Sequence, residues 1–211
     1  MNRQQKLFIE TLRWSGRRYH LTAFHRERML RTSPELRLPP GDMECWLPPV
    51  PDDLQDLTVK CRITYDTEIR TIEFEPYSPR CVRSLQMVCD DSIDYHLKYA
   101  DRSCLDSLRS RRGQADEIII VKNGLVTDTS YSSLLFKAGD RLYTPSTPLL
   151  RGVMVASLLS AGALVRADLT PDDILPGNSL GITHALLVNA MMPPGTISPV
   201  DIRNIYPPAC Q

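Results

Sequence analysis

The stretch ADEIIIVKNGLVTDTSYSSLLF, residues 115–136, decides the fold class of this chain. Its first part, EIIIVK (117–122), is a short apolar run of the kind that forms a buried strand. Asn123-Gly124 follows, and this pair favours a type I′ turn, because both central positions of that turn need a positive φ. The chain is therefore predicted to return through LVTDTS (125–130) as a β-hairpin.

Downstream of this hairpin, the pattern continues as strands and then changes to a helix. SSLLFK (132–137) and RLYTP (141–145) predict a second hairpin around residues 138–140. LLRGVMVASLLSAG (149–162) is typical of a helix, and a last strand is expected between residues 179 and 190.

Upstream, ADRSCLDSLRSRRG (100–113) predicts a helix that ends at Gly113. The N-terminal part is mostly strand, and its predicted elements are a hairpin of FIETLRW (8–14) with RRYHL (17–21), a helix AFHRERMLRT (23–32), and a meander of TVKCRITYD (58–66) with TIEFE (71–75). The predicted class is α+β, with a small N-terminal domain at 1–90 and a larger domain at 91–211.

Composition excludes some classes of function. The 25 basic and 25 acidic side chains balance, which argues against a general nucleic-acid binder. The sequence has no apolar run long enough to cross a bilayer and no apolar region of a signal peptide, so no membrane partner and a cytoplasmic location are expected. The six cysteines lack the spacing of a zinc site, and we expect them to be reduced and mostly packed as small apolar side chains.

Lys98 occupies an unusual position, among Tyr95, Leu97 and Tyr99 in the stretch IDYHLKYADR. One interpretation is a surface lysine that keeps its ammonium in water while its stem covers apolar neighbours. The other is a functional amine whose pKa is lowered by apolar surroundings, because burial disfavours the charged form. Residues around Lys98 do not decide between the two.

Four segments in register resemble the class IV aminotransferases, the fold-type IV enzymes. FHRERM resembles the helix that presents a phosphate-binding arginine three residues after a histidine, which assigns that role to Arg28. LKYADR resembles the segment of the Schiff-base lysine, here Lys98. In the hairpin, an acid after Gly-x-Val-Thr corresponds to Asp128. The resemblance runs from about Phe8 to Val200.

The fourth segment, RLYTPSTPLLRGVMVASLL, resembles the turn and helix whose first amides hold the phosphate, here around Gly152, Val153 and Met154. The resemblance implies pyridoxal 5′-phosphate as cofactor and a two-domain architecture, with a small α/β domain and a larger β-rich pseudo-barrel. It also implies a homodimer. In this family the lysine bonds the cofactor as a Schiff base and then serves as general acid and base, while the acid holds the pyridinium proton.

The chain departs from the family at several positions. Asp128 stands where many members have Glu, and Ser133 stands where Asn is usual. Val153, Val155 and Ala190 replace residues that are often polar or charged. These changes lead us to expect a phosphate held mainly by Arg28 and by backbone N–H groups.

Several alternatives stay open at this level. The chain is expected to act on an amino acid and a 2-oxo acid, but it can instead be an aminodeoxychorismate lyase-like enzyme that releases pyruvate from an amino-chorismate substrate in folate synthesis. A third possibility is a relative that keeps the fold and has lost the cofactor. His25 is expected at the helix surface or half-buried; Asp101 can pair with Arg102 or act at the site, and Tyr131 can line the pocket or pack in the hairpin.

Overall fold

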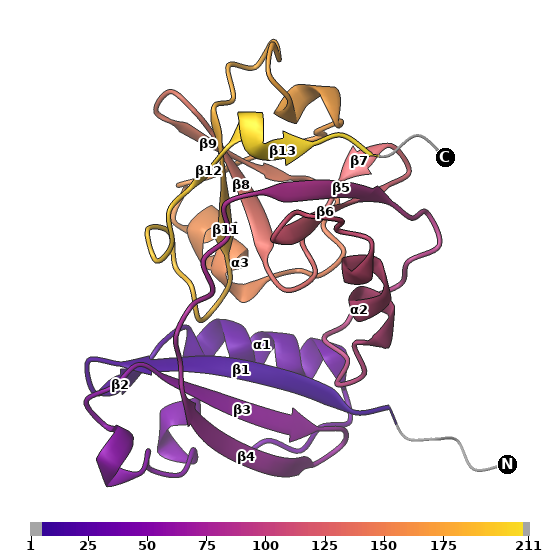
Figure 1. The fold of residues 1–211 in the computed structure, drawn as a ribbon. Helices are drawn as coiled ribbons and strands as arrows, with labels where there is room; N and C mark the ends of the chain where they lie inside the picture. Colours follow the sequence, from indigo (N-terminus) through magenta and orange to yellow (C-terminus); the bar gives the residue numbers. More distant parts are fainter. Residues whose placement is uncertain (1–5, 209–211) are drawn as a thin grey trace, which may run out of the picture. The chain divides into compact units, whose positions relative to one another are not determined.

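The computed structural model describes residues 6–208, and the chain forms two compact units (Figure 1). Unit 1 contains the chain up to Ser78 together with Leu97–Asp101, and unit 2 contains Pro79–His96 and the chain from Arg102 onward. The predicted domain boundaries, 1–90 and 91–211, do not coincide with the boundaries of these two units. The division into two domains at those residues remains a prediction. The α+β class is confirmed by the arrangement of the elements.

Unit 1 is built on an antiparallel sheet of four strands in the order β2-β1-β3-β4. Its elements are β1 (Phe8–Ser15), β2 (Arg18–Tyr19), α1 (Thr22–Thr32), the 3₁₀ turns η1 (Met43–Cys45) and η2 (Asp52–Leu54), β3 (Val59–Tyr65) and β4 (Ile69–Pro76). The predicted hairpin, helix and meander are therefore confirmed.

One face of this sheet is buried. In β3 the side chains alternate between buried and half-buried, as expected for a strand with only one face in a core. Val59, Cys61, Ile63 and Tyr65 point into that core and are fully buried, where Met29 of α1 packs among them. We call this side the inner face of the unit-1 sheet. The opposite side, the outer face, carries the half-buried polar residues.

Unit 2 contains two sheets, in the orders β13-β5-β6-β7 and β10-β9-β8-β11-β12. Its strands are β5 (Leu85–Cys89), β6 (Glu117–Lys122), β7 (Leu125–Val126), β8 (Ser133–Ala138), β9 (Arg141–Pro145), β10 (Val165–Ala167), β11 (His184–Val188), β12 (Val200–Asp201) and β13 (Ile205–Tyr206). Its helical elements are α2 (Ser103–Ser110), α3 (Val153–Ser160) and the 3₁₀ turns η3 (Asp172–Ile174) and η4 (Ile202–Asn204).

Both sheets contribute to one apolar core in unit 2. Met87 and Ile119 come from the first sheet, and Leu134, Phe136 and Ala185 come from the second. β5 and β6 run parallel, so the chain must cross over between them, and α2 forms part of that connection. The curled, β-rich unit agrees with the architecture that the family resemblance implied.

The decisive hairpin forms as the sequence predicts. Asn123 has a φ of 51° and Gly124 a φ of 75°, the positive values that a type I′ turn requires. β6 and β7 pair antiparallel on either side of this turn. The predicted helix before the hairpin is shorter than expected, because α2 ends at Ser110 and the chain reaches Gly113, with a φ of 59°, through a turn.

The cysteines differ from expectation. Cys61 is buried in the core of unit 1, but Cys45, Cys81 and Cys89 are exposed, so the prediction that most would pack as apolar side chains is wrong. These three lie in or beside irregular segments or at a strand end, where no core covers them. Cys210 lies outside the described residues. Between residues 6 and 208, no helix has the length and apolar character needed to cross a membrane.

Candidate functional site

Lys98 is held in place through its backbone by the first strand of unit 1. The Ile9 N–H donates to the Lys98 carbonyl at 2.9 Å, and the Ala100 N–H donates to the Leu7 carbonyl at 2.8 Å. Phe8 and Tyr99 form an antiparallel bridge between these hydrogen bonds. The short segment therefore extends the edge of β1, and the backbone position of Lys98 is fixed although it lies in no regular strand.

Aromatic side chains fasten the same segment. The Tyr99 ring lies 5.5 Å from the Phe8 ring, and Phe8 in turn lies 5.8 Å from Tyr65, measured between ring centroids. The Tyr99 N–H donates to the Leu97 carbonyl at 2.9 Å, so the chain turns sharply at Lys98, and the charge of Lys98 acts on the buried His25 of α1. The Lys98 side chain is half-buried.

Arg28 lies on α1 and is paired with a buried carboxylate of β1. Its Nε donates to Glu10 Oε1 at 2.7 Å and one terminal nitrogen donates to Glu10 Oε2 at 2.6 Å. Glu10 is completely buried and Arg28 is 5% exposed. This two-point contact fixes the plane of the guanidinium and balances its charge.

His25 completes the group and corrects an expectation. It is fully buried, not half-buried at the helix surface, because α1 turns it toward the sheet one turn before Arg28. Its Nδ1 lies 2.5 Å from Glu10 Oε2. Burial by itself raises the pKa of Glu10, but Arg28 and His25 outweigh it and lower that pKa to about 2. The ionised carboxylate only accepts, so Nδ1 of His25 carries the proton.

The state of His25 follows from its surroundings. Burial lowers its pKa, Glu10 opposes that change, and the positive charges of Arg28 and Lys98 lower the pKa further. His25 is thus neutral near pH 7, with the proton on Nδ1. Within the described residues, its buried Nε2 has no hydrogen-bond partner.

In unit 2, Asp128 lies directly after β7 at the base of a tight turn. Its side chain is 6% exposed, and its Oδ2 accepts a hydrogen bond from the Leu150 N–H at 3.1 Å. The Asp128 backbone pairs with Ser133 in a bridge, and its carbonyl accepts from Ile120 of β6 at 2.8 Å. The backbone of Asp128 is therefore held by β6 and β8, and the Leu150 N–H orients its carboxylate.

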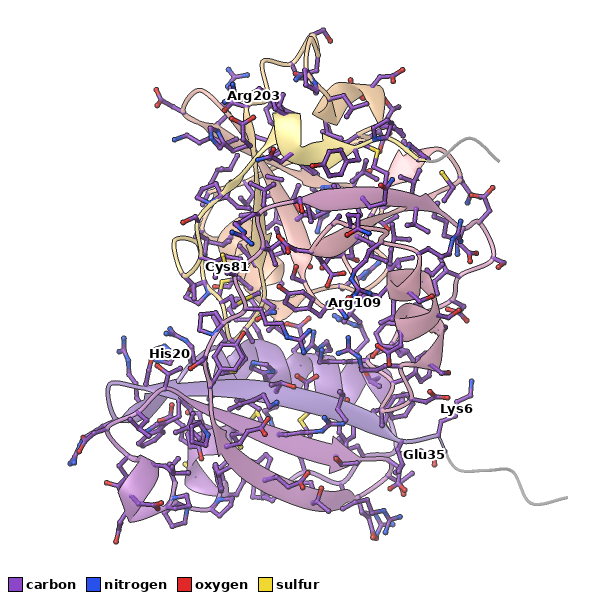
Figure 2. All side chains as sticks on the ribbon, in the orientation of Figure 1. Lys6, His20, Glu35, Cys81, Arg109 and Arg203 are labelled. Atoms are coloured by element: carbon purple, nitrogen blue, oxygen red, sulfur yellow. The ribbon has the colours of Figure 1, made fainter. Side chains whose placement is uncertain are left out.

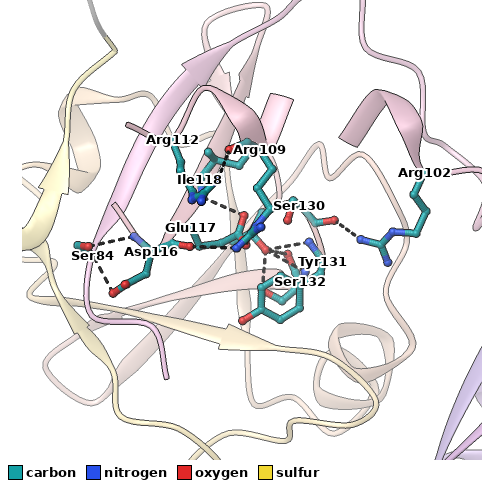
Figure 3. A network of polar contacts seen from close by, with 11 residues as sticks. Ser84, Arg102, Arg109, Arg112, Asp116, Glu117, Ile118, Ser130, Tyr131 and Ser132 are labelled. Carbon is teal, nitrogen blue, oxygen red and sulfur yellow. Dashed lines mark hydrogen bonds and ion pairs between the residues drawn. The ribbon is translucent and has the colours of Figure 1, made fainter. Parts of the chain in front are cut away.

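The turn between Asp128 and Ser133 is stiffened by its own side chains (Figure 3). Thr129 Oγ1 accepts from the Ser132 N–H at 2.9 Å and from the Tyr131 N–H at 3.2 Å. Arg102 donates to the Ser130 carbonyl at 2.8 Å, so this arginine supports the turn. Figure 3 also shows Arg109 reaching the buried Glu117 of β6, with Nε 2.9 Å from Oε2.

Tyr131 lies at the tip of that turn and is half-buried, packed against the core of unit 2. Its carbonyl accepts from Asn189 Nδ2 at 3.3 Å, while Asn189 Oδ1 accepts from the Met191 and Met192 N–H groups at 2.8 and 3.0 Å. Asn189 thus joins the turn after β11 to the turn after Asp128. Ala190 lies in the first of these turns and is 8% exposed.

The N-terminus of α3 approaches the same turn closely. Gly152 precedes the helix, and Val153 and Met154 form its buried first residues. A Cβ atom at Gly152 would lie 2.7 Å from the Oγ of Ser133, closer than real contacts allow. The φ of Gly152 is −68°, so its backbone angle does not call for a glycine, and a side chain there would have to displace the Ser133 hydroxyl.

The predicted residues fall into two sets, each described within its own unit. β1 joins Arg28, through Glu10, to Lys98, through Leu7 and Ile9. In unit 2, Leu150 and Ser133 join Asp128 to the start of α3. Sequence reasoning missed Glu10, although a carboxylate within the apolar strand FIETL was a signal for a buried partner.

Comparison with known proteins identifies a family and similar folds. The model of the amino-transferase class IV family matches residues 7–193. An uncharacterized protein of Haemophilus influenzae strain Rd is 39% identical over 137 residues, which are 65% of this chain and 73% of that protein.

Two solved structures share the fold over nearly the whole chain. The structure of a proposed 4-amino-4-deoxychorismate lyase from Haemophilus somnus 129PT has a TM-score of 0.75 and 26% identity, covering 90% of this chain and 98% of that one. A proposed amino-acid aminotransferase from Mesorhizobium loti has a TM-score of 0.74 and 20% identity, covering 95% and 99%.

Proposed function

The chain belongs to the class IV aminotransferase family, and we propose that it is a pyridoxal-phosphate-dependent enzyme that transfers an amino group between an amino acid and a 2-oxo acid. The observation that supports this most is Lys98, a half-buried lysine in a short segment that two backbone hydrogen bonds, one to the Lys98 carbonyl and one from the Ala100 N–H, bind to β1. A solvated surface lysine needs no such anchoring. A reactive amine needs it, because covalent chemistry depends on a fixed position.

The residues present suit this cofactor. A pyridine ring with an aldehyde and a phosphate needs an amine, an acid and anion-binding donors, and Lys98, Asp128, Arg28 and the start of α3 supply these groups. Gly152 stands directly before the first amides of α3, and a Cβ atom there would lie 2.7 Å from Ser133 Oγ. When bound through a lysine, pyridoxal phosphate supplies an electron sink that makes the α-proton of an amino substrate acidic.

Lys98 is proposed to carry the proton transfers. Its Nζ would take the proton from the substrate α-carbon and later return it. The pairing with β1 fixes the backbone from which the Lys98 side chain extends.

Asp128 is proposed to hold a proton on the pyridine nitrogen. Its carboxylate is nearly buried and already accepts the Leu150 N–H, which orients it. Asp is one methylene shorter than the Glu of many family members. The stiff turn at Thr129 fixes the backbone beside Asp128 and limits how far the carboxylate can move.

The phosphate is proposed to be bound by the Val153 and Met154 amides, since helix N-termini favour anions. Arg28 would add hydrogen bonds more than net charge, because Glu10 already neutralises its guanidinium. This arrangement agrees with the loss of polar side chains at Val153, Val155 and Ala190.

A second candidate is lyase chemistry on an amino-chorismate substrate, with release of pyruvate. The supporting observation is the 26% identity with the proposed 4-amino-4-deoxychorismate lyase, nearly all of whose chain is covered. Lys98 and Asp128 would serve in the same roles. The two candidates differ in one requirement, because only amino transfer needs a 2-oxo acid as acceptor.

Reductive labelling tests the proposed function. The wild type, Lys98→Ala and the control Lys137→Ala are incubated with pyridoxal phosphate, reduced with borohydride and digested for mass mapping. We expect a stable adduct on Lys98 in the wild type and in the control, whose mutated lysine is exposed on β8. Absence of an adduct in the wild type at saturating cofactor would leave the chain as a fold relative without the chemistry.

Activity assays on protein that takes the label then distinguish amino transfer from lyase chemistry. Amino transfer requires a 2-oxo acid and consumes it, whereas pyruvate release from an amino-chorismate substrate does not.

The proposal includes a homodimer in the cytoplasm, and light scattering on the purified protein measures the mass of that dimer directly.

A further inference from the structure

The turn that follows Asp128 extends beyond the strands that carry it. The strand ladder of the hairpin ends at the bridge between Asp128 and Ser133, and residues 129–132 lie past this bridge. Inside the turn, the Thr129 N–H donates to the Ser132 carbonyl at 2.9 Å, and the hydroxyls of these two residues lie 2.8 Å apart. These contacts close the turn on itself, so a displacement of its tip is passed to both of its ends.

The two carbonyls at the tip of this turn accept hydrogen bonds from side chains of other elements. Arg102, at the start of α2, donates from a terminal nitrogen to the Ser130 carbonyl at 2.8 Å. Asn189, directly after β11, donates to the Tyr131 carbonyl at 3.3 Å. Ser130 is 3% exposed, so its carbonyl needs a donor from the protein. The contact from Arg102 is the stronger of the two, because a charged donor forms a shorter and stronger hydrogen bond.

Arg102 occupies a position where its own helix does not favour an arginine. It is the N-cap residue of α2, and its side chain makes no capping hydrogen bond. Short polar side chains cap helices best, and the positive end of the helix dipole repels a cation. The arginine therefore makes its contribution elsewhere, at Ser130, which lies 28 residues further along the chain.

Ion pairing does not account for the position of Arg102. Arg109, which lies on α2 (Figure 2), binds the buried carboxylate of Glu117, with Nε 2.9 Å from Oε2. Arg102 differs, because among residues 6–208 its guanidinium forms no ion pair, and its hydrogen bond goes to the neutral carbonyl of Ser130. A hydrogen bond to a carbonyl fixes a backbone position and neutralises no charge.

We propose that Arg102 is a positioning residue, which holds the turn at Ser130 and thereby keeps the carboxylate of Asp128 in the orientation that serves the pyridine nitrogen of the cofactor. Asp128 stands two residues before Ser130, at the first end of the closed turn. Because an aspartate has only one methylene, a shift of its backbone passes directly to its oxygens. The inference rests on the proposed function for the cofactor, and on contacts within unit 2 alone for the turn.

Hydrogen exchange on the cofactor-free protein tests the contact. Arg102→Met removes every donor of the side chain and keeps an unbranched apolar stem. The control Arg111→Met removes an arginine just after α2, whose terminal nitrogen donates to the Cys89 carbonyl at 3.3 Å. We expect the Thr129 and Ser132 amides to exchange about tenfold faster or more in Arg102→Met, because a charge-assisted hydrogen bond is lost. Arg111→Met should leave both amides at the wild-type rate.

The nitrogen-15 signal of the bound cofactor tests the consequence for Asp128. The chemical shift of a pyridine nitrogen changes strongly when that nitrogen is protonated, so pyridoxal phosphate labelled at this atom reports its proton directly. At slightly alkaline pH, we expect a protonated nitrogen in the wild type and in Arg111→Met, and loss of most of that signal in Arg102→Met. Arg102→Lys should recover part of it, because lysine keeps a charged donor without the guanidinium plane.

The two measurements together give the contrary results. Wild-type exchange rates at Thr129 and Ser132 in Arg102→Met overturn the inference. Faster exchange with an unchanged nitrogen-15 signal also overturns it, because the contact is then merely structural. Should Arg102→Met fail to fold, Arg102→Gln, which has a shorter and neutral side chain, carries both measurements, and wild-type values in this variant contradict the proposal.

Reductive labelling separates this inference from the proposed function. If Lys98 takes no label and the exchange rates of the turn still depend on Arg102, the proposed function fails together with the role toward the cofactor, while the hold of Arg102 on the turn stands. If Lys98 takes the label and the nitrogen-15 signal does not depend on Arg102, the proposed function stands and the positioning role fails.

Discussion

Glu10 accepts hydrogen bonds from two side chains of α1, and this shared acceptor sets the charge state of the whole buried group. Arg28 donates to both carboxylate oxygens and His25 donates to one of them, with nitrogen–oxygen distances of 2.5 to 2.7 Å. The three residues together carry no net charge when His25 is neutral. A buried group whose charges are paired is what a protein interior tolerates, because unpaired buried charges are very costly.

The pH dependence of stability follows from the same residue. The pKa of Glu10 falls from 4.5 to about 2 on folding, so its ionised form stabilises the folded state above pH 4.5. That contribution, about 3 kcal/mol by linkage, is lost as the pH falls toward 2. We expect the urea midpoint of the wild type to drop steeply between pH 5 and pH 2.

The substitution Glu10→Gln tests whether this carboxylate is the source of the pH dependence of stability. The variant leaves Arg28 buried without its counter-charge, so it should be less stable than the wild type at pH 7 by about 3–5 kcal/mol. Its stability should also lose the acid-dependent step described above. Glu35→Gln, at an exposed position, is the control and should keep the step. A step of equal size in Glu10→Gln would assign the pH dependence to other groups.

At the scale of elements, the contact of α3 with the hairpin fixes where the helix begins. Gly152 has an extended backbone and directly precedes the helix, which begins at Val153. Ser133 of β8 lies next to the glycine. A serine where the family usually has asparagine is the smaller side chain at this contact. The size of residue 133 and the absence of a side chain at 152 are therefore coupled.

A double-mutant cycle measures that coupling. Gly152→Ala places a Cβ 2.7 Å from Ser133 Oγ and should cost about 1–3 kcal/mol through overpacking. Ser133→Ala removes the oxygen and leaves the Ser133 Cβ position at 3.8 Å, an ordinary contact. The double variant should recover much of the loss in chemical unfolding. Additive effects of the two substitutions would mean that the collision does not limit the helix position.

Elements that depend on nearby residues could be predicted from the sequence, and pairings between distant segments could not. Asn123-Gly124, the strand β6 and the helix α1 depend on neighbours within a few residues, and all three were predictable. Short strands such as β10 and β13 pair in parallel with β9 and β5, far away in sequence, and local patterns do not encode such pairs.

The candidate site shows the same division. The positions of Arg28, Lys98, Asp128 and Gly152 were assigned from motifs, and their roles stay predictions. Glu10, which holds Arg28 from 18 residues away, needed the pairing of α1 with β1 to be seen. Physical contacts between distant segments, and not the residues themselves, were missing from the sequence-based reasoning.

At the scale of the whole molecule, the segment Leu97–Asp101 ties Lys98 to unit 1 although the chain on either side of it belongs to unit 2. The connection depends on backbone hydrogen bonds to Leu7 and Ile9 and on the Phe8–Tyr99 contact. The reactive lysine of the proposed enzyme is thus positioned by the first strand of the chain.

Ala100→Pro tests this dependence. Proline removes the N–H that the Leu7 carbonyl accepts, so the segment should loosen while both cores stay intact. We expect a fall in borohydride-trapped label on Lys98 and faster hydrogen exchange at the Ile9 amide, with a small change in melting temperature. Ala23→Ser, at an exposed position of α1, controls for a distant substitution, and full labelling of Ala100→Pro would contradict the role of this pairing.

The return of Leu97–Asp101 to β1 also has a consequence during synthesis. The four strands of the unit-1 sheet have left the ribosome once residue 76 has emerged, yet the edge of β1 stays unpaired until the chain is about 25 residues longer. A gene fragment that stops at Ser78 encodes the sheet without its closing segment. In a recombinant of this gene with a relative, the first strand and the lysine segment should therefore come from the same parent, because the two segments pair with each other although they are far apart in the sequence.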